Sequence, residues 1–356
     1  MHSGPGFFQI LWFVLVGVLW AGFFILEGFD FGVGMLVRLL ARDQVEKRMA
    51  IHTIGPVWDG NEVWLIVAGG AMFAAFPLWY ASAFSGFYLA LFLVLVALIV
   101  RGVSFEFWGK VDSERWRSVW EWALAIASGA AALLFGVVWA NFIHGVPMGP
   151  GHVVRVSLLG LLHPYALLGG VTTLSLFLAH GASFLSLRVD GDLQRRAAGA
   201  ERAATPVATL LLAGFLAWTL ADHGWAAQAL IPAALALAAL LAALALNRGD
   251  RRGAGFGSSA LAIGLMTATF MASLYPDVLP SSTSLAAGLT VVNASSNHYT
   301  LVVMTVVAVI FVPVVLAYQG WTYWVFRHRL GRDDYEGPLT PVAVIEHMTA
   351  GHGDRG

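Results

Sequence analysis

The sequence has 356 residues, of which 58% are hydrophobic and 12% are charged, and its mean hydropathy is +0.75. In soluble globular proteins about a quarter of the residues are charged, so this composition indicates a membrane protein. The net charge of −1 gives no argument for nucleic-acid binding. The absence of Cys excludes disulfides, thiolate metal sites and covalently attached c-type haem within the chain.

Nine hydrophobic segments are long enough to cross a bilayer. We place them near residues 7–40, 51–79, 82–101, 117–143, 158–187, 203–222, 226–247, 257–275 and 299–327. The sequence therefore predicts an all-α polytopic membrane protein with nine transmembrane helices. We expect residues 1–335 to form a single transmembrane domain and residues 336–356 to be a disordered cytoplasmic tail.

Basic residues gather on one side of the predicted helices. Of the 20 Lys and Arg residues, all except Arg155 fall at that side, in or beside the loops after the first, third, fifth and seventh helices or in the C-terminal tail. Cytoplasmic loops carry an excess of Lys and Arg. We therefore expect the N-terminus to lie outside and the C-terminus to lie in the cytoplasm.

Four carboxylates lie in the first two hydrophobic segments, Glu27 and Asp30 in the first, Asp59 and Glu62 in the second. A charge inside a bilayer helix costs at least ~2.5–3.5 kcal/mol on insertion scales, so these acids need a reason. Each pair has i, i+3 spacing and shares a helix face. The short connection between the two segments predicts neighbouring helices, with the acids forming a ladder of exchangeable sites from the cytoplasm toward mid-membrane.

These acids have three possible interpretations: a proton or ion path, a counter-charge for a partner, or neutral structural groups. Arg101, at the inner end of the third segment, either pairs with an acid or snorkels to the interface as a topology anchor. We expect Glu121 to be solvated. Small residues such as Gly28, Gly32 and Gly69 permit close approach of helices, and we expect them to face a partner.

Helix-borne His side chains commonly hold haem in membrane oxidases. His180 is the only His that lies clearly inside a predicted helix. No second ligand at matching depth accompanies it in the sequence. We therefore expect this chain to bind no haem itself.

Two segments, 26–36 (LEGFDFGVGML) and 53–65 (TIGPVWDGNEVWL), resemble subunit II of the cytochrome bd quinol oxidases, in particular the actinobacterial type. The resemblance extends over essentially the whole chain and is most specific in the first 80 residues. Further matching segments are 71–77, 116–121, 274–276, 293–296 and 318–327.

This resemblance implies a subunit of a bacterial cell-membrane enzyme that oxidises quinol and reduces dioxygen to water, electrogenically but without proton pumping. It implies two four-helix bundles, here 1–143 and 158–275, plus a ninth peripheral helix, 299–327. It also implies that two b-type haems and one d-type haem lie in a homologous subunit I. The resemblance suggests further partners, namely small single-helix accessory subunits, membrane lipids and a structural quinone or lipid.

The resemblance also assigns roles to individual residues. Acids that match Glu27 and Asp59 belong to a proton path toward the haem d site, to which we add Asp30 and Glu62. A Trp that matches Trp64 lies at the mouth of an oxygen path. The positions that support the site are Asn61, Arg101 and Glu121.

Two other functions remain open from the residues alone. Membrane acids would equally suit a proton- or cation-coupled transporter, although such transporters have internal repeats and discontinuous helices around a midplane site. An odd number of helices, with acids near the inner ends of the first two, argues against that fold. The chain could also be a purely structural subunit whose acids are neutral and inert.

Overall fold

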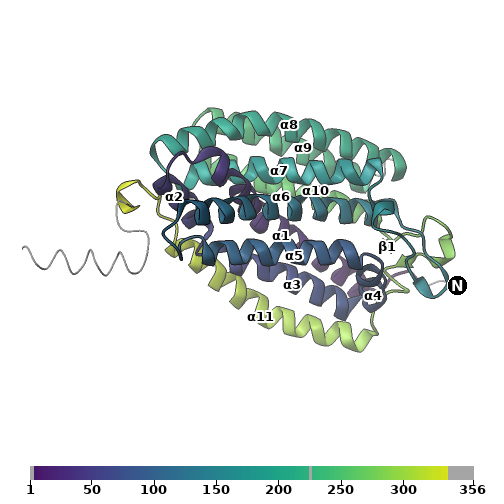
Figure 1. The fold of residues 1–356 in the computed structure, drawn as a ribbon. Coiled ribbons are helices and arrows are strands. Elements are labelled where there is room, and N and C mark those ends of the chain that lie inside the picture. The colour runs from purple at the N-terminus through teal and green to yellow at the C-terminus, as the bar shows by residue number, and fades with distance from the viewer. Residues whose placement is uncertain (1–3, 224–226, 336–356) are drawn as a thin grey trace, which may run out of the picture.

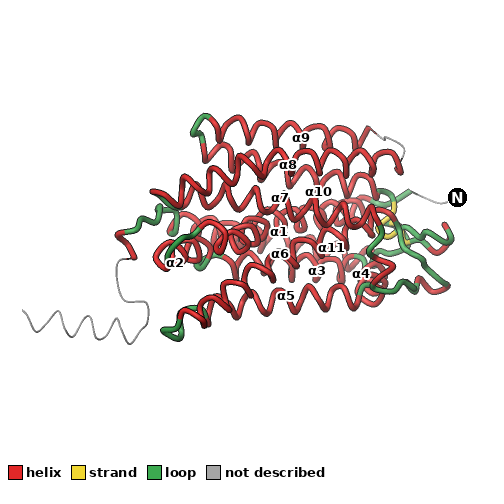
Figure 2. Tube along the Cα trace, turned by 45° about the horizontal axis from the view of Figure 1, so that its top comes forward, coloured by secondary structure: helices red, strands yellow, loops and turns green. Residues whose placement is uncertain are grey.

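The computed structural model describes residues 4–223 and 227–335, and these are overwhelmingly helical (Figure 1). The long helices run side by side, with loops gathered at two opposite ends (Figure 2). The α-helices are α1 (Phe7–Leu40), α2 (Gln44–Ile54), α3 (Trp58–Ala75), α4 (Pro77–Gly86), α5 (Tyr88–Phe107), α6 (Glu114–His144), α7 (Pro164–Arg188), α8 (Gly191–His223), α9 (Ala227–Arg248), α10 (Arg252–Leu274) and α11 (His298–Val325). Two short strands, β1 (Asp277–Leu279) and β2 (Leu289–Thr290), pair antiparallel, and the 3₁₀ turns are η1 (Pro150–His152), η2 (Leu159–Leu161), η3 (Leu285–Ala287) and η4 (Asp333–Tyr335).

Eight of the described helices are long and apolar enough to cross a membrane: α1, α5, α6, α7, α8, α9, α10 and α11. The prediction of an all-helical membrane protein is therefore confirmed. Helix α3 has 18 residues and carries both Asp59 and Glu62, so the count of nine spans stays a prediction. The tail predicted for residues 336–356 lies outside the described residues.

The prediction of one continuous second helix over residues 51–79 is wrong. The structure divides it among α2, α3 and α4, with turns at residues 55–57 and a single non-helical residue at Phe76. Pro56 lacks a backbone N–H and cannot continue α2, and Pro77 disfavours helical geometry at the residue before it. The break places Asp59 in the first turn of a new helix.

Helix α2 lies at the end of the bundle opposite the N-terminus (Figure 1). Asp43 caps it by accepting a hydrogen bond from the Glu46 backbone N–H at 2.9 Å. Glu46 also pairs with Arg196 of α8 at 2.5 Å. The ion pair with Arg196, together with the buried side chains of Met49, Ile51 and Ile54, holds α2 against the bundle.

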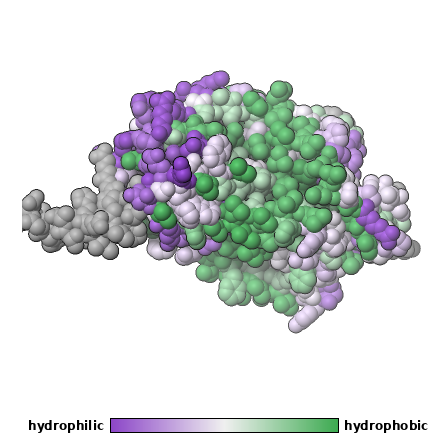
Figure 3. Space-filling view, in the orientation of Figure 1, coloured by the Kyte–Doolittle hydropathy of each residue, from purple (hydrophilic) through white to green (hydrophobic). Residues whose placement is uncertain are grey.

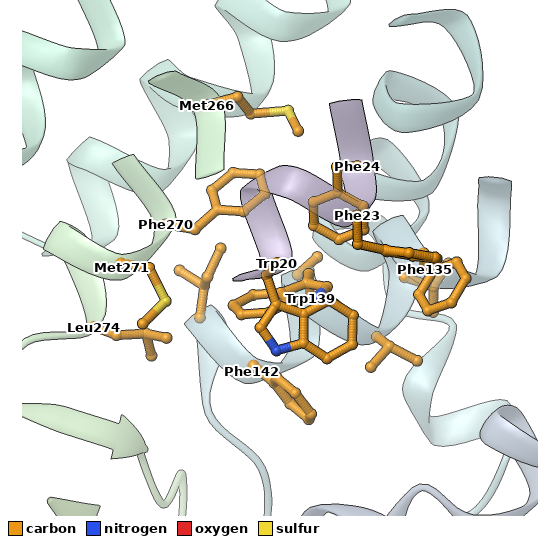
Figure 4. Packing of buried hydrophobic residues seen from close by; sticks show 14 of the residues in the cluster. Trp20, Phe23, Phe24, Phe135, Trp139, Phe142, Met266, Phe270, Met271 and Leu274 are labelled. Carbon is orange, nitrogen blue, oxygen red and sulfur yellow. The ribbon is translucent and has the colours of Figure 1, made fainter. Parts of the chain in front are cut away.

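The core forms around α1, which contacts α3, α6, α7 and α10. Trp20 and Phe24 of α1 pack on Trp139 of α6 with ring centroids 5.3 and 6.1 Å apart, and Phe270 of α10 stacks on the same indole at 6.3 Å (Figure 4). Lipid tails are as apolar as these side chains, so dispersion and shape rather than water exclusion favour the packed state.

The expectation that Gly28 and Gly32 face a partner is wrong. A Cβ on Gly28 would lie 2.8 Å from Phe177 Cδ1, and one on Gly32 would lie 2.7 Å from Gly181 Cα. Both glycines are used inside the chain, where α1 crosses α7. By contrast, no atom lies within 4 Å of a Cβ built on Gly60 or Gly70 of α3.

A broad hydrophobic band covers the middle of the visible face, and hydrophilic residues gather at the end where α2 lies (Figure 3). Helix α11 is peripheral, and Leu301 is its only fully buried residue among those described. This distribution is that of a protein whose long helices are surrounded by lipid or by other membrane helices.

Candidate functional site

Arg101 of α5 gathers three carboxyl groups inside the helix bundle. Its guanidinium lies 3.2 Å from Glu27 Oε2 and 3.9 Å from Asp30 Oδ2 of α1, and 3.5 Å from Glu62 Oε2 of α3. The side chains of Glu27, Asp30 and Arg101 are 0% exposed, and that of Glu62 is 22% exposed. We call these four residues the Arg101 cluster.

The alternative that Arg101 snorkels to the membrane surface is excluded by its complete burial. Its guanidinium lies over the rings of Phe31, Phe105 and Trp58, at 5.0, 5.3 and 5.8 Å from the ring centroids. Among the described residues, none of its nitrogen atoms makes a hydrogen bond of good geometry. Charge attraction and aromatic faces therefore hold the cation in place.

Asn61 of α3 joins the cluster to α11. Its Nδ2 donates to Asp30 Oδ2 at 2.7 Å. Its Oδ1 accepts from the Tyr323 hydroxyl at 2.6 Å and from Gln319 Nε2 at 3.3 Å. Asn61 was expected at the site, but Gln319 and Tyr323 of α11 were not, because nothing in the sequence showed that the last helix lies against α3.

Asp59 does not reach the Arg101 cluster. Its side chain is exposed at the start of α3. Within the described residues it makes no hydrogen bond or ion pair. The structure thus brings Glu27, Asp30 and Glu62 together, whereas Asp59, which we expected in the same ladder of acids, lies apart at the surface of the isolated chain.

The expectation that Glu121 is solvated is wrong. Its side chain is 0% exposed, and one carboxylate oxygen lies 2.8 Å from Arg38 Nη1 and 2.9 Å from Lys47 Nζ. The other accepts a hydrogen bond from Trp108 Nε1 at 3.3 Å. Two turns of α6 carry Glu121 into the bundle, where it binds cations of α1 and α2, so a boundary estimated from hydropathy placed it too close to the loop.

The polar atoms of the Trp64 and His180 side chains are engaged in hydrogen bonds within the chain. Trp64 is half-buried and donates from Nε1 to Gln319 Oε1 at 2.8 Å. His180 is buried, with Nδ1 at 2.7 Å from Ser259 Oγ and Nε2 at 3.2 Å from the Ile25 carbonyl. Both of its ring nitrogens are therefore occupied. No group of three or more His, Asp or Glu side chains in the described part of the chain could hold a metal ion.

The fold and the site define a polytopic α-helical membrane protein with a buried cluster of three acids and one guanidinium. Residues 8–326 match the family described as cytochrome bd terminal oxidase subunit II. The chain belongs to that family. It is accordingly a subunit of an oxidoreductase complex and a multi-pass protein of the bacterial inner membrane.

Two relatives can be aligned with this chain along almost their entire length. Cytochrome bd ubiquinol oxidase subunit 2 of Bacillus subtilis (strain 168) is 41% identical over 334 residues, covering 93% of this chain and 98% of the relative. Cytochrome bd-I ubiquinol oxidase subunit 2 of Escherichia coli (strain K12) is 37% identical over 366 residues, covering 92% and 96%. Because the chain belongs to this oxidase family, the alternative that it is a proton- or cation-coupled transporter is excluded.

The fold is also similar to that of a chain in the structure of bd oxidase from Geobacillus thermodenitrificans. The TM-score is 0.71, and the match covers 90% of this chain and 98% of that one. The sequences are 18% identical in this match, so the similarity concerns the fold alone.

Proposed function

We propose that this chain is the haem-free subunit of a quinol:oxygen oxidoreductase and that the Arg101 cluster carries protons from the cytoplasm toward the dioxygen-reducing haem of a partner subunit I. In this proposal the chain has nine spans, α3 in addition to the eight helices named above, with an outer N-terminus and a cytoplasmic C-terminus. The two four-helix bundles and peripheral α11 follow from the family resemblance. The haems of the partner would supply the electron transfer and oxygen chemistry.

The charge balance of the Arg101 cluster carries this proposal. One guanidinium faces three carboxyl groups, so the buried site is electrically neutral only when two of the three carboxyls hold protons. Among the described residues, Asp30 Oδ1 and both oxygens of Glu27 have no hydrogen-bond donor. These oxygens are available to take up and release a proton, which is the requirement for a relay.

In this proposal Asp59 and Glu62 form the entry to the cluster. Asp59 is exposed and lies three residues before Glu62, whose carboxyl is partly exposed and contacts Arg101. A proton taken from water at Asp59 could thus reach the buried pair through Glu62. In the same proposal Trp64 borders an oxygen path, and Asn61 and Glu121 support the site structurally.

The absence of haem from this chain is supported by the surroundings of His180. Its ring stacks on Phe256 with centroids 4.6 Å apart and planes 4° apart. Because Ser259 and the Ile25 carbonyl occupy its two nitrogens, an iron atom could bind only after these contacts were broken. A structural role for His180 is the simpler account.

The partner would cover the face formed by α3, α5 and α11. Large apolar side chains are exposed there, including Ile66, Phe92, Ile99 and Phe311. A groove of about 670 Å³ between α3 and α5 is lined by apolar side chains. Membrane helices of subunit I, small accessory subunits, lipid or a structural quinone would fill these surfaces.

The test uses the intact complex, purified through a tag on this chain. Asp30→Asn and Asp59→Asn each remove an exchangeable proton site while keeping the size of the side chain. We expect normal haem spectra and a slower oxygen consumption per haem in both, because oxygen reduction needs cytoplasmic protons. Glu114→Gln, at an exposed acid in the first turn of α6, is the matched control.

Three outcomes contradict the proposal. If both Asp variants turn over normally per haem, the acids are not a relay. If they lose assembly but the residual enzyme has normal turnover per haem, the acids serve the structure alone. Co-purification without b- and d-type haem bands would reject the assignment to a haem-containing complex.

A further inference from the structure

Helix α11 is hydrogen-bonded to the rest of the chain near its two ends, and its middle is exposed. At its beginning, Trp12 Nε1 of α1 donates to the Leu301 carbonyl at 3.1 Å and to Thr305 Oγ1 at 3.0 Å. From residue 309 to residue 318 every side chain is exposed. Almost three turns of this helix therefore have every side chain exposed in the isolated chain, and partial burial resumes only at Gln319.

The second attachment of α11 is the hydrogen-bond network around Asn61. Two donors of α11, the Tyr323 hydroxyl and Gln319 Nε2, both point to Asn61 Oδ1. They fix which end of the amide faces α11, and they leave the Nδ2 group to donate to Asp30 Oδ2. Gln319 is itself oriented, because its Oε1 accepts from Trp64 Nε1.

Residues 326–335, which we call the C-terminal strap, hold this end of α11 against the rest of the chain. The Leu330 N–H donates to the Arg188 carbonyl at 2.9 Å, and the Asp190 N–H donates to the Leu330 carbonyl at 3.2 Å. Beyond this point the strap reaches α2. Arg332 pairs with Asp43 at 2.8 Å, and the Tyr335 hydroxyl lies 3.2 Å from His52 Nδ1.

We propose that Tyr323 and Gln319 are positioning residues for Asp30, which act through Asn61 and are kept in place by the C-terminal strap. With its Oδ2 engaged by Asn61, Asp30 presents the other oxygen, Oδ1, as the atom that exchanges a proton. The proton-handling site then includes the last helix of the chain as well as α1, α3 and α5. This inference rests on the proposed function, and its test must separate the two.

The test compares Tyr323→Phe with Tyr318→Phe in the intact oxidase complex. Both variants delete one phenolic hydroxyl from α11, but Tyr318 is 66% exposed, and its side chain makes no hydrogen bond within the described residues. The first measurement is infrared difference spectroscopy, in which the bands of the Asp30 carboxyl are identified by their loss in Asp30→Asn. The second is oxygen consumption per haem at saturating quinol.

We expect Tyr323→Phe to shift the Asp30 bands and to lower turnover by about three- to tenfold, the effect of losing one neutral hydrogen bond, with unchanged haem content. Tyr318→Phe should match the unaltered protein in both measurements. Leu330→Pro removes the strap's donor to Arg188 and should reproduce the band shift, whereas Leu330→Ala keeps that donor and should not.

The outcomes separate this inference from the proposed function. Shifted Asp30 bands with normal turnover in Tyr323→Phe support the positioning role and contradict the relay. Unchanged bands in Tyr323→Phe overturn the positioning role, even if Asp30→Asn slows the enzyme. Unchanged bands in Leu330→Pro overturn the part assigned to the strap.

Discussion

The backbones of Gly32 and Gly181 meet where α1 crosses α7, and a Cβ on Gly32 would lie 2.7 Å from the Gly181 Cα. No side chain fits between the helices at this point. The face of α1 opposite α7 carries the acids that reach Arg101. The crossing therefore fixes how far Glu27 and Asp30 extend toward α5.

Gly32→Ala should destabilise the protein by about 1–3 kcal/mol, because the added methyl group must push two backbones apart. The measurement is thermal unfolding of the purified complex, followed by haem release and by aggregation. Gly214→Ala on α8, away from the face assigned to the partner, is the matched control for the fold, since its Cβ meets no atom within 4 Å. An unchanged unfolding temperature for Gly32→Ala would mean that the two helices are not in this close contact.

Arg101→Leu should lower stability by about 3–5 kcal/mol, the cost of removing one partner from a buried ion pair. The cause is the uncompensated negative charge of the carboxyl groups that remain. Adding Glu27→Gln and Asp30→Asn to Arg101→Leu should therefore recover part of the loss. If the triple variant is as unstable as the single one, the packing of the Arg101 side chain against Phe31 and Phe105 matters more than its charge.

Glu121→Gln should loosen α2, because Arg38 and Lys47 lose the carboxylate that both contact. Lys47 is almost buried, so its unpaired charge makes the α2 position unfavourable. We expect faster hydrogen exchange in residues 44–54, measured by mass spectrometry, with little change in α9. Glu114→Gln, at the exposed start of α6, should leave that exchange unaltered.

His163, the N-cap of α7, should make stability depend on pH at the end of the bundle where α6 connects to α7. Burial lowers its pKa, and the neighbouring His144 lowers it further. The unfolded chain, with a pKa of about 6.5, then binds a proton before the folded chain does. Stability is full above this value and falls as the pH decreases through it, until the lower folded pKa is reached.

This dependence can be measured as the unfolding temperature between pH 7.5 and 5.5. His163→Asn keeps a capping side chain and removes the titration, so its unfolding temperature should decrease less over this range. Equal slopes for the two proteins would assign the pH dependence to other groups.

Much of the fold could be predicted because lipid imposes long apolar helices that hydropathy detects. Hydropathy predicted α8 and α9 as two separate helices, although only a short connection joins them. The second helix was misjudged because hydropathy ignores the missing N–H of Pro56 and the restriction that Pro77 places on Phe76. The membrane orientation rests on Lys and Arg placement and stays a prediction.

The candidate site was predictable only as far as local spacing reaches. The i, i+3 pattern showed that Glu27 and Asp30 share a face, and a buried Arg101 was one of two alternatives. The contact between Asn61 and Tyr323 joins residues that are 262 positions apart. Helical periodicity carries no information about such a pair, so α11 could not be assigned to the site in advance.

Pro313 lies in the middle of the exposed stretch of α11. Proline removes one hydrogen bond from the helix ladder and makes that point the easiest place to bend. Because α11 is held near both ends and lacks one backbone hydrogen bond at Pro313, a lateral force on the helix bends it at that residue. We therefore expect membrane components that pack on the exposed turns of α11 to change its curvature at Pro313 before they break the contacts to Trp12 and Asn61.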